Sequence, residues 1–87
     1  MNWVYIINGP VKKSLDRIPG KDTLIILEVI DKMQDGPYAG DVVKLGGTAW
    51  RKRAGNYRIK FYINQKLHQI EIYEIERRTS TTYRKGR

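Results

Sequence analysis

The order of hydrophobic and polar positions predicts a strand and a helix at the start of the chain. Residues 3–7 are β-branched or aromatic and predict a short strand. Asn8-Gly9-Pro10 interrupts this run and favours the start of a helix, because proline is tolerated in a first helical turn. Apolar residues then recur at helical spacing, at Val11, Leu15 and Ile18. We therefore expect a first helix that ends before Pro19-Gly20.

A second helical pattern follows this break. Asp22 is a suitable N-terminal cap, because its short carboxylate can accept a backbone N–H at the start of a helix. The apolar positions then follow the i, i+3, i+4, i+7 spacing, at Ile26, Val29, Ile30 and Met33. Asp35-Gly36-Pro37 ends the pattern. We expect two short helices in antiparallel contact.

The second half of the chain changes from helical to strand periodicity. After a loop at residues 38–41, strand character is found at residues 42–45, 48–54, 57–63 and 67–77. Gly55-Asn56 is typical of a two-residue hairpin turn. The sequence thus predicts an α+β fold, in which an N-terminal strand and two short antiparallel helices accompany a small antiparallel sheet, with the helices on one face.

The Gly55-Asn56 turn determines which side chains share a face of the sheet. It places Arg53 opposite Arg58 and Trp50 opposite Phe61. With Gln65-Lys66 as the next turn, the expected pairs are Phe61 with Ile70, Ile59 with Ile72, Lys60 with Glu71 and Arg58 with Tyr73. Both turns give the same apolar face, buried against the helices, made of Trp50, Ile59, Phe61, Ile70 and Ile72. The opposite face carries Arg51, Arg53, Arg58 and Lys60.

Composition limits the function classes that the chain can serve. At 87 residues we expect one domain, 1–87, whose polar residues 79–87 form a partly loose tail. The chain has no cysteine, which excludes disulfides and thiol chemistry, and its single histidine, His68, argues against a metal site. No segment is typical of a signal peptide or a membrane span. We expect a cytoplasmic protein that binds no membrane.

Charge indicates the kind of partner. Lysine and arginine number 17 against 9 acidic residues, a net charge of +8, which is typical of proteins that meet a polyanion such as nucleic acid. Like charges directly opposite each other destabilise a sheet by about 0.2–1 kcal/mol, so the predicted pairing of Arg53 with Arg58 favours a phosphate-binding role. The alternative is that these arginines only keep an exposed face soluble.

From Leu45 to Tyr83 the sequence resembles the RelE branch of the RelE/ParE toxin superfamily. The matching residues are Leu45, Trp50-Arg51-Lys52-Arg53, Gly55-Asn56-Tyr57-Arg58-Ile59, the strand from Ile70 to Ile75, Arg77 and Tyr83. The preceding strand and two helices match the family's layout, so the resemblance covers nearly the whole chain. The basic strand before the turn and the late arginine and tyrosine favour the RNA-cutting branch over the gyrase-poisoning one.

The resemblance implies roles for individual residues. Arg58, Arg77 and Tyr83 would be catalytic, with Tyr83 as the base or as a stacking platform. By the resemblance, Arg51 and Arg53 would bind RNA, and Arg78 competes with Arg77 because one bulge would exchange them. The register adds Lys60 on the same face to the RNA-binding residues, and Tyr73 is a further candidate for stacking with a base. The family's best-known members have lysines where this chain has Arg51 and Arg53. Since arginine gives up a proton poorly, the identity of the general acid stays open.

The resemblance also implies a function. It is that of the toxin component of a type II toxin–antitoxin system, a metal-independent endoribonuclease that needs no cofactor. Such an enzyme uses the RNA 2′-hydroxyl as nucleophile, cuts mRNA in the ribosomal decoding site and inhibits translation. Its expected protein partner is an acidic cognate antitoxin. Two alternatives remain: a ParE-like inhibitor of DNA gyrase with the same fold, and a non-catalytic nucleic-acid-binding module.

Overall fold

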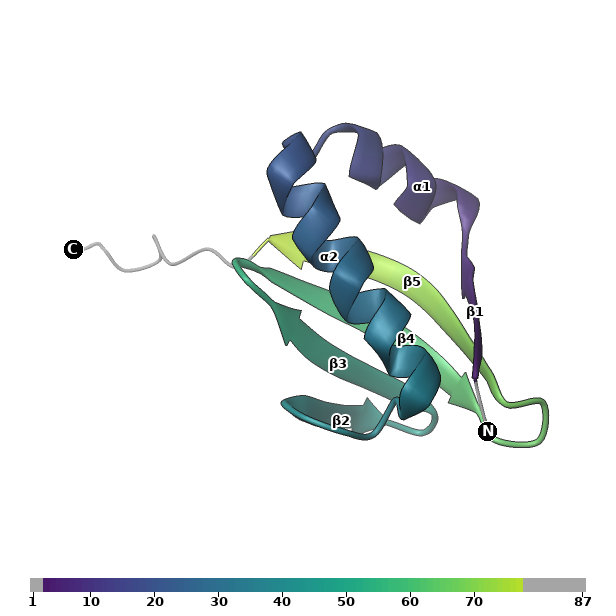
Figure 1. Ribbon diagram of the computed structural model, residues 1–87. Coiled ribbons are helices and arrows are strands. Elements are labelled where there is room, and N and C mark those ends of the chain that lie inside the picture. The colour runs from purple at the N-terminus through teal and green to yellow at the C-terminus, as the bar shows by residue number, and fades with distance from the viewer. Residues whose placement is uncertain (1–2, 78–87) are drawn as a thin grey trace.

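The computed structural model describes residues 3–77 and contains one sheet and two α-helices (Figure 1). In chain order the elements are β1 (Val4–Ile7), α1 (Gly9–Asp16), α2 (Gly20–Lys32), the 3₁₀ turn η1 (Met33–Asp35), β2 (Val42–Gly46), β3 (Ala49–Ala54), β4 (Tyr57–Asn64) and β5 (Gln69–Arg77). The predicted α+β class and order of elements are confirmed. Residues 78–87 lie outside the described part, and so does the predicted tail.

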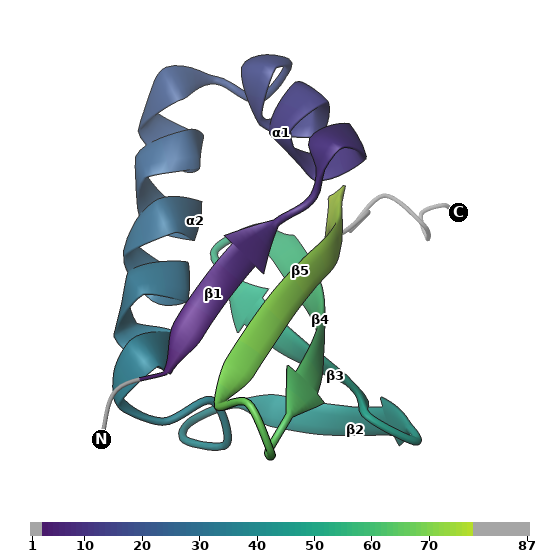
Figure 2. The ribbon, with the colours of Figure 1, turned by 90° about the vertical axis from the view of Figure 1, so that its right-hand side faces the viewer.

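The sheet is mixed, which corrects the prediction of an antiparallel sheet. Its strand order is β1-β5-β4-β3-β2, and β1 pairs with β5 in parallel, while the other neighbours are antiparallel. Figure 2 shows β1 and β5 side by side and pointing the same way. The two helices separate β1 from the antiparallel strands β2 to β5. The last of these strands, β5, lies beside β1 and runs in the same direction. Since β1 pairs only with β5 among the described strands, it forms one edge of the sheet.

Capping explains where the two helices begin. The Asn8 side chain accepts the Val11 backbone N–H at 3.0 Å, which is the expected N-terminal cap of α1. The prediction that Asp22 caps the second helix is wrong, because α2 already begins at Gly20 after Pro19 and receives no side-chain cap. Asp22 lies in the first turn of α2 instead and accepts a hydrogen bond from the Tyr57 hydroxyl at 3.1 Å. This bond ties α2 to the start of β4.

The first hairpin has the predicted register. Arg53 pairs with Arg58 and Trp50 pairs with Phe61 across a two-residue turn. Gly55 has a φ of 60° and is the only one of the two turn residues in the left-handed region, which favours glycine. A turn this short leaves little freedom in the pairing of the strands that it joins.

The second hairpin differs from the prediction by two positions. Phe61 pairs with Ile72 rather than Ile70, because the connection spans residues 65–68 and includes His68 in the left-handed region, at a φ of 52°. The Asn64 side chain accepts the Leu67 backbone N–H and closes this longer turn. A bulge then shifts the register beyond Phe61, so that Lys60 pairs with Glu74 and Arg58 with Glu76, not with Glu71 and Tyr73.

The core lies between the helices and one face of the sheet. A two-residue shift keeps side chains on the same face, so the predicted burial of the apolar residues is confirmed for Ile59, Phe61, Ile70 and Ile72. They pack with Val11 of α1 and with Ile26 and Ile30 of α2 in one cluster. Trp50 is only half-buried; it lies near the β2 edge, where Tyr38 packs edge-on against its ring.

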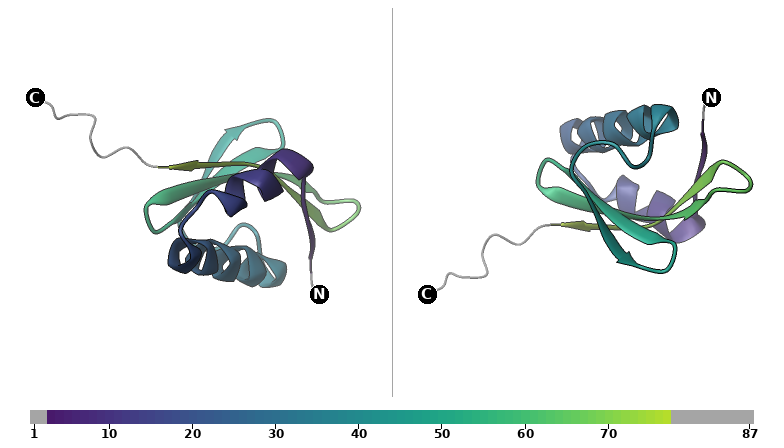
Figure 3. Two further views of the ribbon diagram at one scale, coloured as in Figure 1. Left: turned by 90° about the horizontal axis from the view of Figure 1, so that it is seen from above. Right: turned by 90° about the horizontal axis from the view of Figure 1, so that it is seen from below.

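The other face of the sheet carries no helix. Views from above and below show α2 along one side of the sheet and the opposite side uncovered within the described residues (Figure 3). We call this uncovered side the open face. Its side chains come from alternate positions of the strands and include Arg51, Arg53, Arg58, Lys60, Tyr62 and Glu71. Within residues 3–77, neither helix combines the length and apolar character needed to cross a bilayer.

Candidate functional site

Four basic side chains from two adjacent strands meet on the open face. Arg51 pairs with Lys60 across β3 and β4, and Arg53 pairs with Arg58 one step nearer the turn. Directly paired residues of an antiparallel sheet have Cβ atoms about 4.5–5.5 Å apart, so these four form two adjacent like-charged pairs. The structure thus brings together all four of the basic residues that the hairpin register predicts.

Carboxylates from β5 and from the loop before β2 moderate this positive charge. Arg58 Nη1 lies 3.9 Å from Glu76 Oε1, and Arg53 Nε lies 3.9 Å from Asp41 Oδ2. Both contacts are at the outer limit of an ion pair and are exposed, so each contributes little to stability. No ion pair within residues 3–77 includes Arg51. The arginines therefore keep most of their capacity to bind an anion.

Lys60 is held more firmly than the arginines. Its ammonium lies 3.3 Å from Glu74 and 3.7 Å from Glu76. The hydrogen bond to Glu74 raises the pKa of Lys60 above its usual value, while partial burial acts in the opposite direction. Lys60 is therefore a permanent cation at physiological pH. Glu74 and Glu76 reach the open face through the β5 bulge, which the sequence pattern does not reveal.

Two tyrosines extend the open face beside the cations. The rings of Tyr62 and Tyr73 stack at a centroid distance of 4.2 Å and an interplanar angle of 19°. Tyr73 is half-buried, whereas Tyr62 is 41% exposed. Unpaired bases of RNA commonly stack on such rings. Tyr73 was selected from the sequence as a stacking residue, but the more exposed ring is that of Tyr62, which the alternation along β4 could have identified.

Arg77 does not lie with the arginines of the open face. It pairs with Tyr57, whose ring is buried on the helix side, so the Arg77 side chain belongs to that side of the sheet. There it lines a hollow of about 260 Å³ with Ser14 of α1 and with Arg17, the C-terminal cap residue of α1. The structure consequently separates Arg77 from Arg58. Arg78 and Tyr83 lie outside the described residues.

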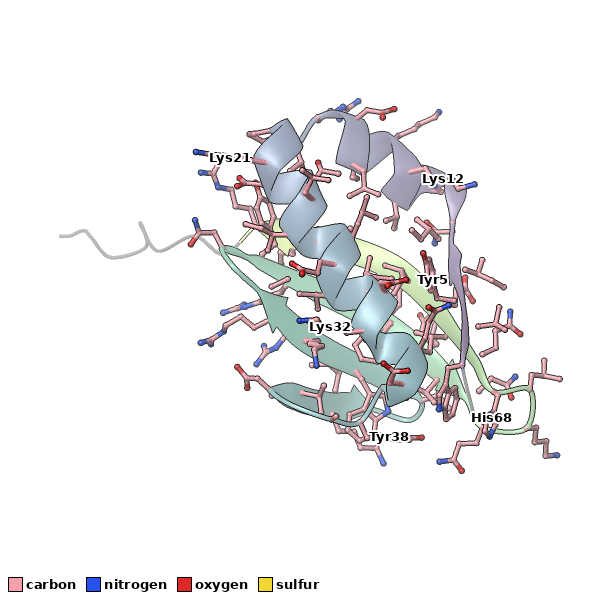
Figure 4. All side chains as sticks on the ribbon, in the orientation of Figure 1. Tyr5, Lys12, Lys21, Lys32, Tyr38 and His68 are labelled. Atoms are coloured by element: carbon pink, nitrogen blue, oxygen red, sulfur yellow. The ribbon has the colours of Figure 1, made fainter. Side chains whose placement is uncertain are left out.

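Other basic residues lie away from the open face as well. Lys52 is on the helix side and donates a hydrogen bond from Nζ to the Ala39 carbonyl at 2.7 Å. Figure 4 shows Lys12 and Lys21 on the helices and His68 near Tyr38, at the end of the sheet that is distant from the β3–β4 turn. The His68 ring stacks on Trp3 at 4.4 Å. This contact accounts for the single histidine as a packing residue at the rim of the molecule.

The open face can bind phosphates without a metal ion. Among residues 3–77, no three acidic or histidine side chains cluster closely enough to hold a metal ion. The guanidinium groups of Arg51, Arg53 and Arg58 offer paired N–H donors that match phosphate oxygens. The open face is a cationic surface that is exposed to water. Such a surface is better suited to an extended polyanion than to a small substrate that must be buried.

Comparison with solved structures identifies similar proteins, whereas comparison with protein-family models and curated sequences does not. No protein-family model matches the sequence, and no curated protein sequence matches it. The structure is similar to a chain of the archaeal RelE–RelB complex from Pyrococcus horikoshii, with 30% sequence identity and a TM-score of 0.81, over 92% of this chain and 99% of that chain.

Two further solved structures share the fold. A chain of the RelB–RelE antitoxin–toxin complex from Methanococcus jannaschii is 23% identical, with a TM-score of 0.67 over 88% of this chain and 94% of that chain. A variant of the Escherichia coli toxin RelE in the free state is 7% identical, with a TM-score of 0.76 over 94% of this chain and 90% of that chain. At these identities the similarity concerns the fold alone.

Proposed function

The chain belongs to the RelE family of toxins from toxin–antitoxin systems, and on this basis we propose that it is a ribosome-dependent endoribonuclease that cuts mRNA and stops translation. The observation that carries the proposal is the group of four cations on the open face, Arg51, Arg53, Arg58 and Lys60. Two adjacent like-charged pairs are unfavourable for the sheet and become favourable when phosphates lie between them.

The proposed reaction needs no metal ion or cofactor. The RNA 2′-hydroxyl attacks the adjacent phosphorus, the bond to the 5′-oxygen of the next nucleotide breaks, and a 2′,3′-cyclic phosphate forms. Alignment of the attacking and leaving oxygens and stabilisation of the negatively charged phosphorane supply most of the acceleration. Arg58 stabilises the phosphorane. Arg51, Arg53 and Lys60 hold the scissile phosphate and its neighbours in the ground state.

The proton transfers fall to the C-terminal residues. Tyr83 is the proposed base, since surrounding arginines would lower the pKa of a tyrosine hydroxyl and so make the phenolate accessible. The late arginine is Arg77 or Arg78, and the position of Arg77 on the helix side favours Arg78 for the role beside Arg58. Because arginine is a poor proton donor, the leaving oxygen receives its proton from another group, such as water or the ribosome.

The proposed partners follow from charge and from the relatives. The Pyrococcus horikoshii and Methanococcus jannaschii structures contain RelE in complex with RelB. With a net charge of +8, this chain would be held inactive by an acidic antitoxin that covers its cations. The ribosome would present mRNA in the decoding site and supply the orientation that an uncovered sheet face lacks.

Addition of the protein to a translation extract tests this function against its two alternatives. Mapping of mRNA ends should reveal cuts within translated codons. Intact mRNA together with inhibited supercoiling by DNA gyrase would favour a gyrase inhibitor instead. Intact mRNA with normal supercoiling, but salt-sensitive RNA binding, would favour a non-catalytic binding module.

A further inference from the structure

A polar cleft opens at one end of the open face, beside the tyrosine pair. It has a volume of about 440 Å³, which is within the range of about 300–1,000 Å³ typical of small-ligand sites. The side chains and backbone that line it come from the end of β4, the following turn, the start of β5 and the residue before β3: Thr48, Tyr62, Ile63, Asn64, Gln65, Lys66, Gln69 and Glu71. Amides, a hydroxyl, a carboxylate and the Lys66 ammonium thus converge in one place.

The carboxylate in this cleft differs from the others on β5. Glu74 and Glu76 each form ion pairs with Lys60, and Glu76 also pairs with Arg58. Glu71 is exposed, and within residues 3–77 it forms no ion pair with a lysine or arginine. A carboxylate without an ion pair repels phosphate, so the Glu71 side of this cleft is unsuited to the RNA backbone, although the Lys66 ammonium also lines the cleft. The Glu71 side is suited to a ligand group that donates hydrogen bonds.

An aromatic surface borders the same cleft. Tyr62 lines it, whereas its stacking partner Tyr73 does not. Glu71 pairs directly with Tyr62 across the two strands, which places the carboxylate next to the ring. A ring for stacking with an acceptor at its edge is the combination by which proteins recognise an unpaired nucleobase.

We propose that this cleft binds an unpaired guanine of the RNA, stacked on Tyr62 and recognised by Glu71. The Watson–Crick edge of guanine carries two adjacent donors, N1–H and the 2-amino group, which match the two oxygens of a carboxylate. Adenine, cytosine and uracil each place an acceptor next to their donor on this edge, which the carboxylate would repel. The inference rests on the proposed RNA substrate and adds a base preference to it.

The cleft lies along β4 from the basic residues of the open face. Lys60 lies two residues before Tyr62 on β4, a separation of roughly 6.7 Å, and Arg58 lies two residues further. A guanine on Tyr62 would therefore place neighbouring phosphates along the rows that hold Lys60 and Arg58. One strand of RNA can occupy the base cleft and the cationic rows together.

Binding of short 2′-O-methyl RNAs tests this inference without any cleavage. One oligonucleotide carries a single guanine among uracils, and a second carries inosine, which lacks the 2-amino group, at the same place. Fluorescence anisotropy at low salt should show about tenfold tighter binding of the guanine oligonucleotide. Backbone amide signals of Thr48, Asn64 and Gln69 should shift with guanine. Equal affinities for the two oligonucleotides would overturn the inference.

Two variants locate the effect. Glu71→Gln removes the matched acceptor pair and should bring the affinity ratio of guanine to inosine close to one, whereas Glu28→Gln, the same charge change on the exposed side of α2, should keep it. Tyr62→Leu should weaken binding of the guanine oligonucleotide by about tenfold through loss of stacking. A ratio that survives Glu71→Gln would refute the role of this cleft. Because the RNA cannot be cut, failure of the nuclease proposal would leave these results unchanged.

Discussion

Arg53 and Arg58 lie directly opposite each other on β3 and β4, with both side chains on the open face. Each has a carboxylate only at the outer limit of an ion pair: Asp41 at 3.9 Å for Arg53 and Glu76 at 3.9 Å for Arg58. Their mutual repulsion is therefore incompletely screened by the protein. A phosphate between the two guanidinium groups would remove it, which makes this pair the centre of the proposed RNA site.

Replacement of Arg58 by alanine should abolish toxicity and leave the fold intact. Loss of one charge-assisted contact to the phosphorane lowers single-turnover cleavage by about 10²–10³-fold, by analogy with removal of an oxyanion-hole donor. Stability should change by less than about 1 kcal/mol, because the loss of a surface ion pair and the relief of repulsion from Arg53 are of similar size. Urea unfolding and single-turnover cleavage measure the two effects.

The comparison with Arg53→Ala shows whether Arg58 acts mainly in the transition state. Arg53 is assigned to the ground-state grip, so its loss should weaken RNA binding and cleavage together. Arg58→Ala should reduce cleavage far more than binding. Equal losses of binding and cleavage in the two variants would show that Arg58 only holds the RNA.

The position of Arg77 on the helix side leads to a second prediction. Arg77→Ala should retain cleavage within about threefold of the wild-type rate, because the side chain lies with Tyr57 and Arg17 away from the open face. Arg78→Ala should lower the rate by about tenfold or more, as expected for loss of a contact to a charged group. The reverse order in single-turnover assays would show that the end of β5 rearranges when RNA binds.

Salt dependence measures how many phosphates the open face neutralises. For single-stranded RNA the slope of log affinity against log salt is about −0.7 per phosphate, so four cations give at most about −2.8. Arg53→Ala should make the slope about 0.7 less steep. Arg17→Ala removes the arginine that caps the C-terminus of α1, on the helix side, and should not alter the slope. An affinity that does not change with salt would mean that the open face is not the binding surface.

A fourth prediction concerns stability at alkaline pH. Burial and the hydrogen bond to Asp22 raise the pKa of the Tyr57 hydroxyl, and the hydrogen bond to Glu74 raises the pKa of Lys60. A raised pKa favours the protonated group in the folded state, so both contributions are complete below the ordinary pKa values, near about pH 10, and are lost as pH rises through the folded-state values.

The urea midpoint should consequently fall as the pH rises above about 10. Tyr57→Phe should lower the midpoint at neutral pH, because the bond to Asp22 is lost, and should make the further fall at alkaline pH shallower. An alkaline fall as steep in Tyr57→Phe as in the wild type would show that Tyr57 does not contribute to it.

The part of the fold that was predictable is the part in which local constraints are strong. The two-residue turn at Gly55-Asn56 leaves one register for β3 and β4, so the positions of Arg51, Arg53, Arg58 and Lys60 followed from the sequence. The second hairpin was less predictable, because a four-residue connection with the non-glycine His68 at positive φ has no comparable sequence signal.

The bulge in β5 explains most of what the sequence did not reveal about the site. It places Glu74 opposite Lys60 and Glu76 opposite Arg58, and it sends Arg77 to the helix side. Strand alternation alone predicts none of these three positions, since one extra residue moves every later side chain of the strand to the opposite face of the sheet. The direction of β1 was similarly hidden, because it depends on which strand returns beside it and not on its own residues.

Cleavage of mRNA on purified ribosomes tests the central claim most directly. Ribosomes are programmed with an mRNA whose nucleotide before the cut site carries either a 2′-hydroxyl or a 2′-deoxy group, and cleavage is followed in a single turnover. The proposal predicts rapid cutting of the first mRNA, with a 2′,3′-cyclic phosphate on the upstream fragment, and no cutting of the second. Cleavage of the 2′-deoxy mRNA at the same rate, or no cleavage of either mRNA, would contradict it.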